Sequence, residues 1–268
     1  ALAWYQARDG RPAWDVTGGA MDAQALLARL DAPESHALPA AAYSPAALRA
    51  RVQGAGDAQA HPEDLAQLEL DLTRALVRYA GDMAAGALKP SRVDSEIHLF
   101  PERPQTPTIL TSAAASPELG GWLDALAPRD PGYDALREVY ARLQREAEAG
   151  GWRATLSEGG TLRLGDAGPR VTQLRARLAE LGEAAPATAQ PELYDAGLEQ
   201  AVMGFQRRHG LNDDGIAGSR TFAALGADVG FRIRQVAVNL ERMRWAPDDL
   251  GRKYIVVNQP DYRMRLYE

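Results

Sequence analysis

The stretch that decides the fold of one domain is TLRLGDAGPRVTQLRARLAELG, residues 161–182. Its apolar residues Val171, Leu174 and Leu178 recur at spacings of three and four, which predicts one face of a helix ending at Gly182. The pattern returns twice further along the chain. A second face holds Leu198, Ala201, Val202 and Phe205 and ends at Gly210, and a third holds Thr221, Phe222 and Leu225 and ends at Gly226. Residues 161–225 therefore predict a small bundle of three short helices.

The residues before this bundle also carry helical patterns. A short amphipathic helix is expected around Asp22–Leu30, and a longer one over Pro62–Ala80, with Gly81 and Gly86 beyond its end. The longer helix presents a stripe of five residues, Leu65, Leu68, Leu72, Leu76 and Tyr79. Another helix is expected to start at Asp130-Pro131 and to stop at Gly150-Gly151, with Tyr133, Leu136, Val139, Tyr140 and Leu143 on one face.

Prolines interrupt the helical pattern between Leu88 and Pro117. They stand at positions 90, 101, 104, 107 and 117, and they exclude a long helix across this segment. Ile97–Phe100 is an extended piece that could pair as a short strand.

The last residues change character. A helical face of Ile233, Val236, Leu240 and Met243 is followed by two alternating runs, 254–258 and 262–267, around Asn258-Gln259-Pro260-Asp261. The two runs predict a β-hairpin, which is hardly stable by itself in water. The sequence thus predicts a mainly α fold, with a helical domain, a three-helix bundle and a C-terminal β-hairpin that opens a further, β-rich domain.

Composition narrows the possible functions of the chain. It has 268 residues, 46% of them hydrophobic, a formal net charge of −6 and no cysteine. The acidic balance argues against binding to nucleic acid, and the absence of cysteine excludes a cysteine nucleophile or thiolate metal site within these residues. No apolar run is long enough to span a membrane. The opening ALAWYQARDG lacks signal-peptide features, so the chain is either cytoplasmic or has lost a targeting segment.

The sequence offers no catalytic residue, metal site or cofactor site. Its four histidines, His36, His61, His98 and His209, are not at metal-ligand spacing, and no nucleophile elbow, P-loop or dinucleotide fingerprint occurs. Asp213-Asp214-Gly215 lacks the full ligand spacing of a calcium loop and is interpreted as a turn. Binding is the function that remains.

Three groups of residues resemble the peptidoglycan-binding domain of bacterial cell-wall enzymes. They are LRLGDAGPRVTQL (162–174), LYD (193–195) with AVMGFQ (201–206), and GLNDDGIAG (210–218). Arg175 departs from the family pattern, which more often has glutamine there, and residues 183–192 form an insert. The resemblance implies a module that binds glycan strands and stem peptides.

The flanking segments resemble large L,D-transpeptidases. Residues 126–136, Trp4-Tyr5 and Pro12-Ala-Trp14 are similar to their helical scaffold, and 238–245 with 254–266 are similar to the entry of their catalytic domain. The resemblance implies domains at 1–160, 161–228 and 229–268, a periplasmic location and formation of 3→3 cross-links in the whole protein. The catalytic histidine and cysteine motif is expected beyond residue 268, so this chain would be the non-catalytic scaffold and binding portion. Other cell-wall synthesis proteins are possible partners.

Two alternatives remain at this point, a stand-alone binding or scaffolding protein and a fragment of another wall enzyme such as an amidase. For the binding module, the candidate contacts are Arg175, Gln206 and Asn212 as planar donors and acceptors and Tyr194 as an aromatic face for a sugar ring. Gln206 and Asp214 could instead tie the helices and their turns together.

Overall fold

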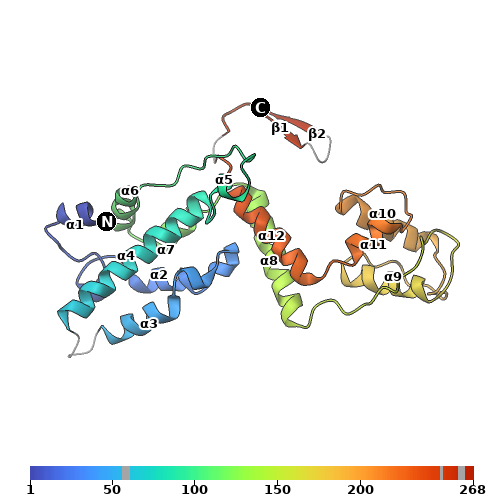
Figure 1. The fold of residues 1–268 in the computed structure, drawn as a ribbon, viewed down its shortest axis with the longest axis horizontal. Helices are drawn as coiled ribbons and strands as arrows, with labels where there is room; N and C mark the ends of the chain where they lie inside the picture. The colour runs from blue at the N-terminus through green and yellow to red at the C-terminus, as the bar shows by residue number, and fades with distance from the viewer. Residues whose placement is uncertain (56–60, 248–249, 259–262) are drawn as a thin grey trace. The chain divides into compact units, whose positions relative to one another are not determined.

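The computed structural model of the chain describes residues 1–55, 61–247, 250–258 and 263–268. Within these residues the fold is mainly α-helical, with one two-stranded antiparallel sheet (Figure 1). The chain divides into two compact units, residues 1–141 with 236–250 and residues 142–235 with 251–268. The mainly α fold class predicted from the sequence is confirmed.

The first unit is built from short helices around one long helix, α4 (Figure 1). Helix α4 contacts α2, α3 and α6, and α2 also contacts α7. The elements that begin in this unit are α1 (Leu2–Gln6), η1 (Asp15–Thr17), α2 (Ala23–Leu30), η2 (Pro33–His36), η3 (Ala40–Ala42), α3 (Pro45–Gly54), α4 (Pro62–Ala85), α5 (Pro90–Val93), α6 (Thr106–Ala115), α7 (Leu119–Asp124) and α8 (Pro131–Glu148). The helices predicted near Asp22–Leu30, from Pro62 and from Pro131 are confirmed.

Helix α4 runs further than its sequence pattern predicts. Gly81 was expected beyond the helix but lies inside it, and the cap is Gly86. The Arg103 guanidinium packs against the bare Cα of Gly81, where a Cβ would lie 2.5 Å from Arg103 Nε. Arg103 pairs with the buried Asp82 of the next position and donates to the Gly86 carbonyl at 3.1 Å. These tertiary contacts allow the helix to continue through Gly81, although glycine inside a helix destabilises it by about 0.5–1 kcal/mol.

The proline-rich segment differs from its prediction. Helix α6 occupies Thr106–Ala115 with Pro107 in its first turn, and Ile97–Phe100 lies outside any strand. Proline in a first turn costs no hydrogen bond, because that N–H has no partner within the helix. Pro107 is therefore compatible with a helix here, and the short strand suggested for Ile97–Phe100 is wrong.

A buried carboxylate attaches the start of the chain to α4. Glu69 accepts hydrogen bonds from the Tyr5 hydroxyl and from the Ala13 backbone N–H, both at 2.6 Å, and from the Thr17 hydroxyl. One turn later, Thr73 accepts from the Trp14 indole N–H at 3.0 Å. The aromatic residues near positions 4–14 therefore belong to the core of the first unit, where Trp14 is fully buried.

Residues 236–250, which include the C-terminal half of α12 (Val229–Met243), belong to the first unit. Arg244 is fully buried there and donates to the His36 carbonyl, to Tyr133 Oη at 2.8 Å and to Glu241 Oε2 at 3.0 Å. Its guanidinium also lies 5.5 Å from the centre of the Tyr133 ring. The helix predicted through Ile233–Met243 is confirmed.

The second unit contains α9 (Pro169–Glu180), α10 (Ala196–Arg208) and α11 (Ser219–Leu225), which confirms the three predicted helices of the bundle. It also contains β1 (Tyr254–Asn258) and β2 (Arg263–Tyr267), paired from Tyr254↔Tyr267 to Asn258↔Arg263. The predicted hairpin is confirmed in its two strands. Its turn, residues 259–262, lies outside the described residues.

Candidate functional site

The three helices of the bundle surround one apolar core and are joined by two short bridges. The core contains Leu162, Val171, Leu174, Leu178, Tyr194, Leu198, Val202, Phe205, Ala217 and Leu225. Isolated β-bridges pair Leu162 with Ala217 and Ala167 with Leu193. The first bridge brings the segment before α9 beside the loop between α10 and α11, although some 55 residues separate them.

A buried amide organises the loop between α10 and α11. The Gln206 side chain is 1% exposed, and its Oε1 accepts from the Gly215 backbone N–H at 3.0 Å. Its Nε2 lies within 3.2 Å of three acceptors, Asp214 Oδ1, the Ile216 carbonyl and Thr221 Oγ1. One side chain on α10 thus satisfies polar groups of the loop and of the first turn of α11.

The loop itself makes the predicted turn at Asp214-Gly215. Asp214 Oδ1 accepts from the Ile216 backbone N–H at 2.9 Å, and Gly215 has a φ of +71° that favours glycine. Asn212 Nδ2 donates to Asp214 Oδ2 at 2.8 Å. The Ile216 N–H bond, with further bonds from Gln206 and Asn212, outweighs desolvation and holds the pKa of the Asp214 carboxyl below its usual value. The loop therefore keeps a charged carboxylate at neutral pH.

Arg177 fixes the far end of α11. Its guanidinium is buried and donates to the Leu225 and Ala227 carbonyls, both at 2.7 Å. A cation at this position satisfies carbonyls that a helix leaves unpaired at its end. Both ends of α11 are thus held from α9 and α10.

A hollow of about 230 Å³ opens between this loop, the first turn of α11 and Thr161. It is lined by Thr161, Gln206, Leu211, Asn212, Asp214, Ile216, Gly218, Ser219, Arg220 and Thr221. Asn212, Ser219 and Arg220 are exposed, and within the described residues no ion pair or hydrogen bond engages the Arg220 guanidinium. The hollow therefore offers a cation, an amide, hydroxyls and a carboxylate beside the apolar Leu211 and Ile216.

The structure brings two of the four predicted contact residues together at this hollow. Gln206 lies in its wall and Asn212 at its surface. Tyr194 has no exposed surface, and its hydroxyl donates to the Gly215 carbonyl at 2.7 Å, so its ring belongs to the core and presents no face to a sugar. Arg175 lies outside the lining and pairs with Asp195 at 2.7 Å while donating to the Leu193 carbonyl at 2.9 Å.

Sequence reasoning did not select Thr161, Ser219 and Arg220 as contacts. Thr161 reaches the hollow only through the bridge between Leu162 and Ala217, which no local pattern predicts. Ser219 and Arg220 follow Gly218 in the first turn of α11. The sequence signal for them was their place at the start of a predicted helix, next to the predicted turn at Asp214.

Two further observations concern metal binding and membrane spanning by the described residues. They contain no group of three or more histidine, aspartate or glutamate side chains placed to hold a metal ion. None of the helices they form combines the length and apolar character needed to cross a bilayer.

Comparison with known proteins agrees with the architecture of both units. Residues 2–139 match the scaffold domain family, and residues 167–225 match the putative peptidoglycan binding domain family. The fold and these matches define a helical, modular protein with a peptidoglycan-binding domain and an association with the cell wall. Since the first match covers just over half of its 268 residues, the chain belongs to the scaffold domain family.

One curated relative shares part of this sequence. The chain is 43% identical over 76 residues to the N-acetylmuramoyl-L-alanine amidase CwlM of Mycobacterium tuberculosis. The match covers 25% of this chain and 19% of that amidase, so the chain spans about a fifth of the relative's length.

Proposed function

We propose that the chain binds peptidoglycan through the hollow between the Asp214 loop and α11. The observation that carries this proposal is that the segment matching the peptidoglycan-binding domain family, residues 167–225, supplies nine of the ten lining residues. Peptidoglycan presents hydroxyls, amides and carboxylates, and the hollow offers complementary groups for each of them.

Within this proposal, the exposed side chains make the contacts and the buried ones hold them in place. Arg220 takes a carboxylate of a stem peptide in a charge-assisted pair, and Asn212 exchanges hydrogen bonds with an amide. Gln206 and Tyr194 support the loop from within, through Gly215. Arg175 fixes the loop before α10 through Asp195. The four residues selected from the sequence thus divide into one contact residue and three positioning residues.

Co-sedimentation of the chain with purified sacculi tests this proposal. Wild-type chain should pellet with sacculi, and Arg220→Glu should weaken binding at least about tenfold, because it replaces a charge-assisted bond by a repulsion. Arg234→Glu makes the same charge change at an exposed position of α12 in the same unit and should leave binding unchanged. Equal binding of Arg220→Glu and wild type would contradict the assigned site. Sedimentation no greater than that of an unrelated helical protein would contradict binding itself.

We further infer that the chain is the non-catalytic scaffold and binding portion of a periplasmic L,D-transpeptidase. The similarity of residues 126–136, 238–245 and 254–266 to that family supports this inference, together with the scaffold domain match. In the whole protein a downstream cysteine thiolate would attack a peptide carbonyl of a donor stem, break its C–N bond and release the C-terminal residue as the amine, which leaves a thioester acyl-enzyme. An amine of a second stem would then attack the thioester carbonyl, form the new amide and release the thiol. Binding by the bundle would raise the local concentration of the polymer at that cysteine.

An amidase is the second candidate for the whole protein, because 76 residues align with a mycobacterial amidase at 43% identity. Muropeptide analysis after expression of the whole gene separates the two. New 3→3 cross-linked dimers support the transpeptidase. Release of stem peptides from the glycan, without new cross-links, supports the amidase and overturns the transpeptidase assignment.

A further inference from the structure

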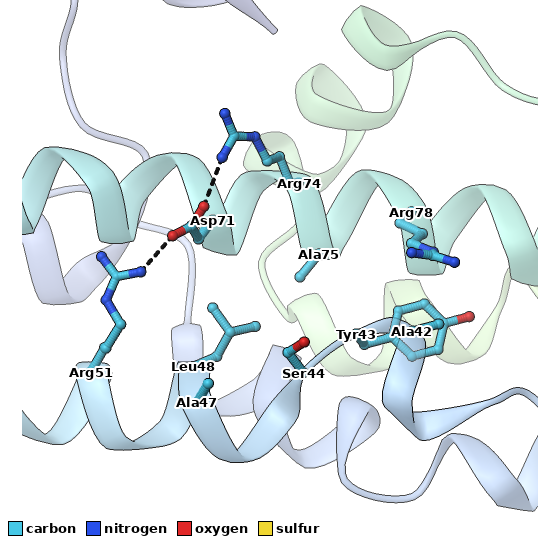
Figure 2. Close-up of a pocket in the computed structure, with 10 residues that line it drawn as sticks. All are labelled: Ala42, Tyr43, Ser44, Ala47, Leu48, Arg51, Asp71, Arg74, Ala75 and Arg78. Carbon is cyan, nitrogen blue, oxygen red and sulfur yellow. Dashed lines mark hydrogen bonds and ion pairs between the residues drawn. The ribbon is translucent and has the colours of Figure 1, made fainter.

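A second hollow, of about 330 Å³, lies in the first unit between α3 and α4 (Figure 2). Ten residues line it: Ala42, Tyr43, Ser44, Ala47, Leu48, Arg51, Asp71, Arg74, Ala75 and Arg78. Figure 2 shows Arg51, Asp71 and Arg74 at one end and Arg78 beside Tyr43 at the other, with Ala47, Leu48 and Ala75 between them. We call this hollow the arginine groove. Its lining carries three guanidinium groups against one carboxylate, so it attracts anions.

The carboxylate in the lining of the arginine groove, that of Asp71, is already engaged. Asp71 pairs with Arg51 at 2.5 Å and with Arg74 at 2.8 Å, and it accepts from Gln67 Nε2 at 2.9 Å. Burial opposes its ionisation, but the bonds from Arg51, Gln67 and Arg74 prevail and hold the pKa of the Asp71 carboxyl below its usual value. The single carboxylate in the lining is therefore charged and shared between two arginines.

Arg74 and Arg78 keep donors that the described residues do not use. Among the described residues, Arg74 donates to Asp71 through Nη1 alone, so its Nε and Nη2 donors remain. Arg78 lies 3.7 Å from Asp82 through Nε, beyond hydrogen-bond distance, and its guanidinium rests 5.7 Å from the centre of the Tyr43 ring. Asp82 itself is occupied by Arg103 and by the Tyr43 hydroxyl at 2.8 Å. Two cations one helical turn apart repel each other, and a bound anion removes that repulsion.

Ser44 contributes a hydroxyl that does not cap the helix after it. It precedes α3 as the N-cap residue, yet its side chain makes no capping hydrogen bond. Its φ of +49° lies in the left-handed region, which costs a non-glycine residue about 1 kcal/mol or more. The hydroxyl of a strained, exposed serine thus stands in the lining of the arginine groove.

We propose that the arginine groove binds an extended acidic segment of a partner protein, with carboxylates on alternate residues. Arg74 and Arg78 are about 6 Å apart along the axis of α4. Alternate residues of an extended chain are about 6.6 Å apart and point to the same side, so two such carboxylates face the two guanidiniums together. The apolar floor of Ala47, Leu48 and Ala75 accepts the intervening chain, which a compact anion such as phosphate would leave uncovered. The site lies wholly in the first unit and does not depend on peptidoglycan binding by the bundle.

Peptide titrations of the full chain, followed by fluorescence anisotropy, test the proposal. A labelled peptide with glutamates on alternate residues (Ala-Glu-Ala-Glu-Ala) should bind at least about tenfold more tightly than its glutamine analogue. It should also bind several-fold more tightly than a peptide with the two glutamates adjacent. The affinity should fall as salt is raised, since the arginines are partly exposed.

Three variants locate the site. Arg74→Gln with Arg78→Gln should weaken peptide binding at least about tenfold. Arg92→Gln with Arg129→Gln removes the same charge from exposed positions of the same unit and should leave binding unchanged. Ser44→Gly should raise thermal stability, because glycine adopts the left-handed φ without cost. It should lower peptide affinity, because it removes the hydroxyl that the lining offers to the backbone of the bound segment. A serine with a structural role alone would not produce this pair of opposite effects.

Each of the following results would overturn the proposal. They are equal affinity for the glutamate and glutamine peptides, equal affinity for alternate and adjacent glutamates, unchanged binding by the folded Arg74 and Arg78 variant, and displacement of the peptide by equimolar inorganic phosphate. Tighter binding of a stem peptide released from sacculi than of the glutamate peptide would indicate that the groove binds the wall polymer. That result would also overturn the proposal of a partner protein.

Discussion

At the scale of single residues, buried polar side chains do most to fix each unit. Arg244 is fully buried in the first unit, where its Nη1 donates to Glu241 and its Nη2 donates to the His36 carbonyl and the Tyr133 hydroxyl. Gln206 has the same role in the second unit. Neither residue belongs to an apolar stripe. Arg244 joins segments far apart in the sequence, and Gln206 joins α10 to the loop and helix that follow it.

Arg244→Ala should destabilise the first unit by about 3–5 kcal/mol, because it leaves Glu241 and two buried acceptors without their partner. Arg244→Met preserves much of the volume and should cost less than Arg244→Ala. Urea unfolding followed by circular dichroism measures both. An Arg244→Ala variant within about 1 kcal/mol of wild type would show that the buried network contributes little.

His36 and His209 should remain neutral at pH 5.5. Burial, with help from neighbouring arginines, lowers the pKa of His36 to about 3 and that of His209 to about 4. Both folded pKa values lie below the unfolded value of 6.5. At a pH between the folded and the unfolded value, each histidine therefore takes up a proton when the chain unfolds. The stability that the neutral rings contribute is complete above pH 6.5 and is lost as the pH falls toward the folded pKa values. Imidazole NMR titration checks this, and a midpoint near 6.5 for either ring would refute its assignment.

At the scale of elements, tertiary contacts decide where helices end and how loops are held. Helix α4 continues through Gly81 because Arg103 packs over that residue and pairs with Asp82. The loop after α10 takes its shape from Gln206, and α11 is held at its far end by Arg177.

Gly81→Ala should destabilise the chain, although glycine to alanine inside a helix ordinarily stabilises by about 0.5–1 kcal/mol. The new Cβ would displace the Arg103 guanidinium and weaken its pair with Asp82. In an Arg103→Ala background the same change should become stabilising, with a coupling energy of about 1–2 kcal/mol in the double-mutant cycle. Additive effects would show that Arg103 does not account for the glycine.

Gln206→Leu should destabilise the bundle by about 2–3 kcal/mol, because it leaves the buried Gly215 N–H without an acceptor and removes the donor shared by Asp214, Ile216 and Thr221. Gln200→Leu on the exposed part of the same helix is the control and should stay within about 0.5 kcal/mol of wild type. Thermal unfolding compares the two. Equal effects would mean that Gln206 does not organise the loop.

At the scale of the whole molecule, the chain has two units with separate apolar cores. The first includes residues 236–250, which follow the bundle in the sequence. The sequence places these residues in a third domain that begins at 229, and that boundary stays a prediction. Because the cores are separate, a substitution in one unit is expected to destabilise that unit and to leave the other unchanged.

Hydrogen exchange followed by mass spectrometry should separate the two units. Arg244→Ala should accelerate exchange in residues 1–141 and 236–250 and leave α9, α10 and α11 at wild-type rates. Gln206→Leu should do the reverse. Faster exchange in both units for either variant would show that they unfold as one cooperative body.

The sequence by itself determined the helices with strong apolar periodicity, the paired strands near the end and the turn at Asp214-Gly215. Local patterns suffice there, because apolar spacing and glycine conformation act within a few residues. The structure alone decided the extent of α4, the presence of α6 with Pro107 in its first turn and the burial of Tyr194. It also decided which polar groups meet at each hollow, since Thr161 beside Arg220 and Ser44 beside Arg78 are long-range neighbours. Such pairs form only when the core closes, and no local spacing encodes them.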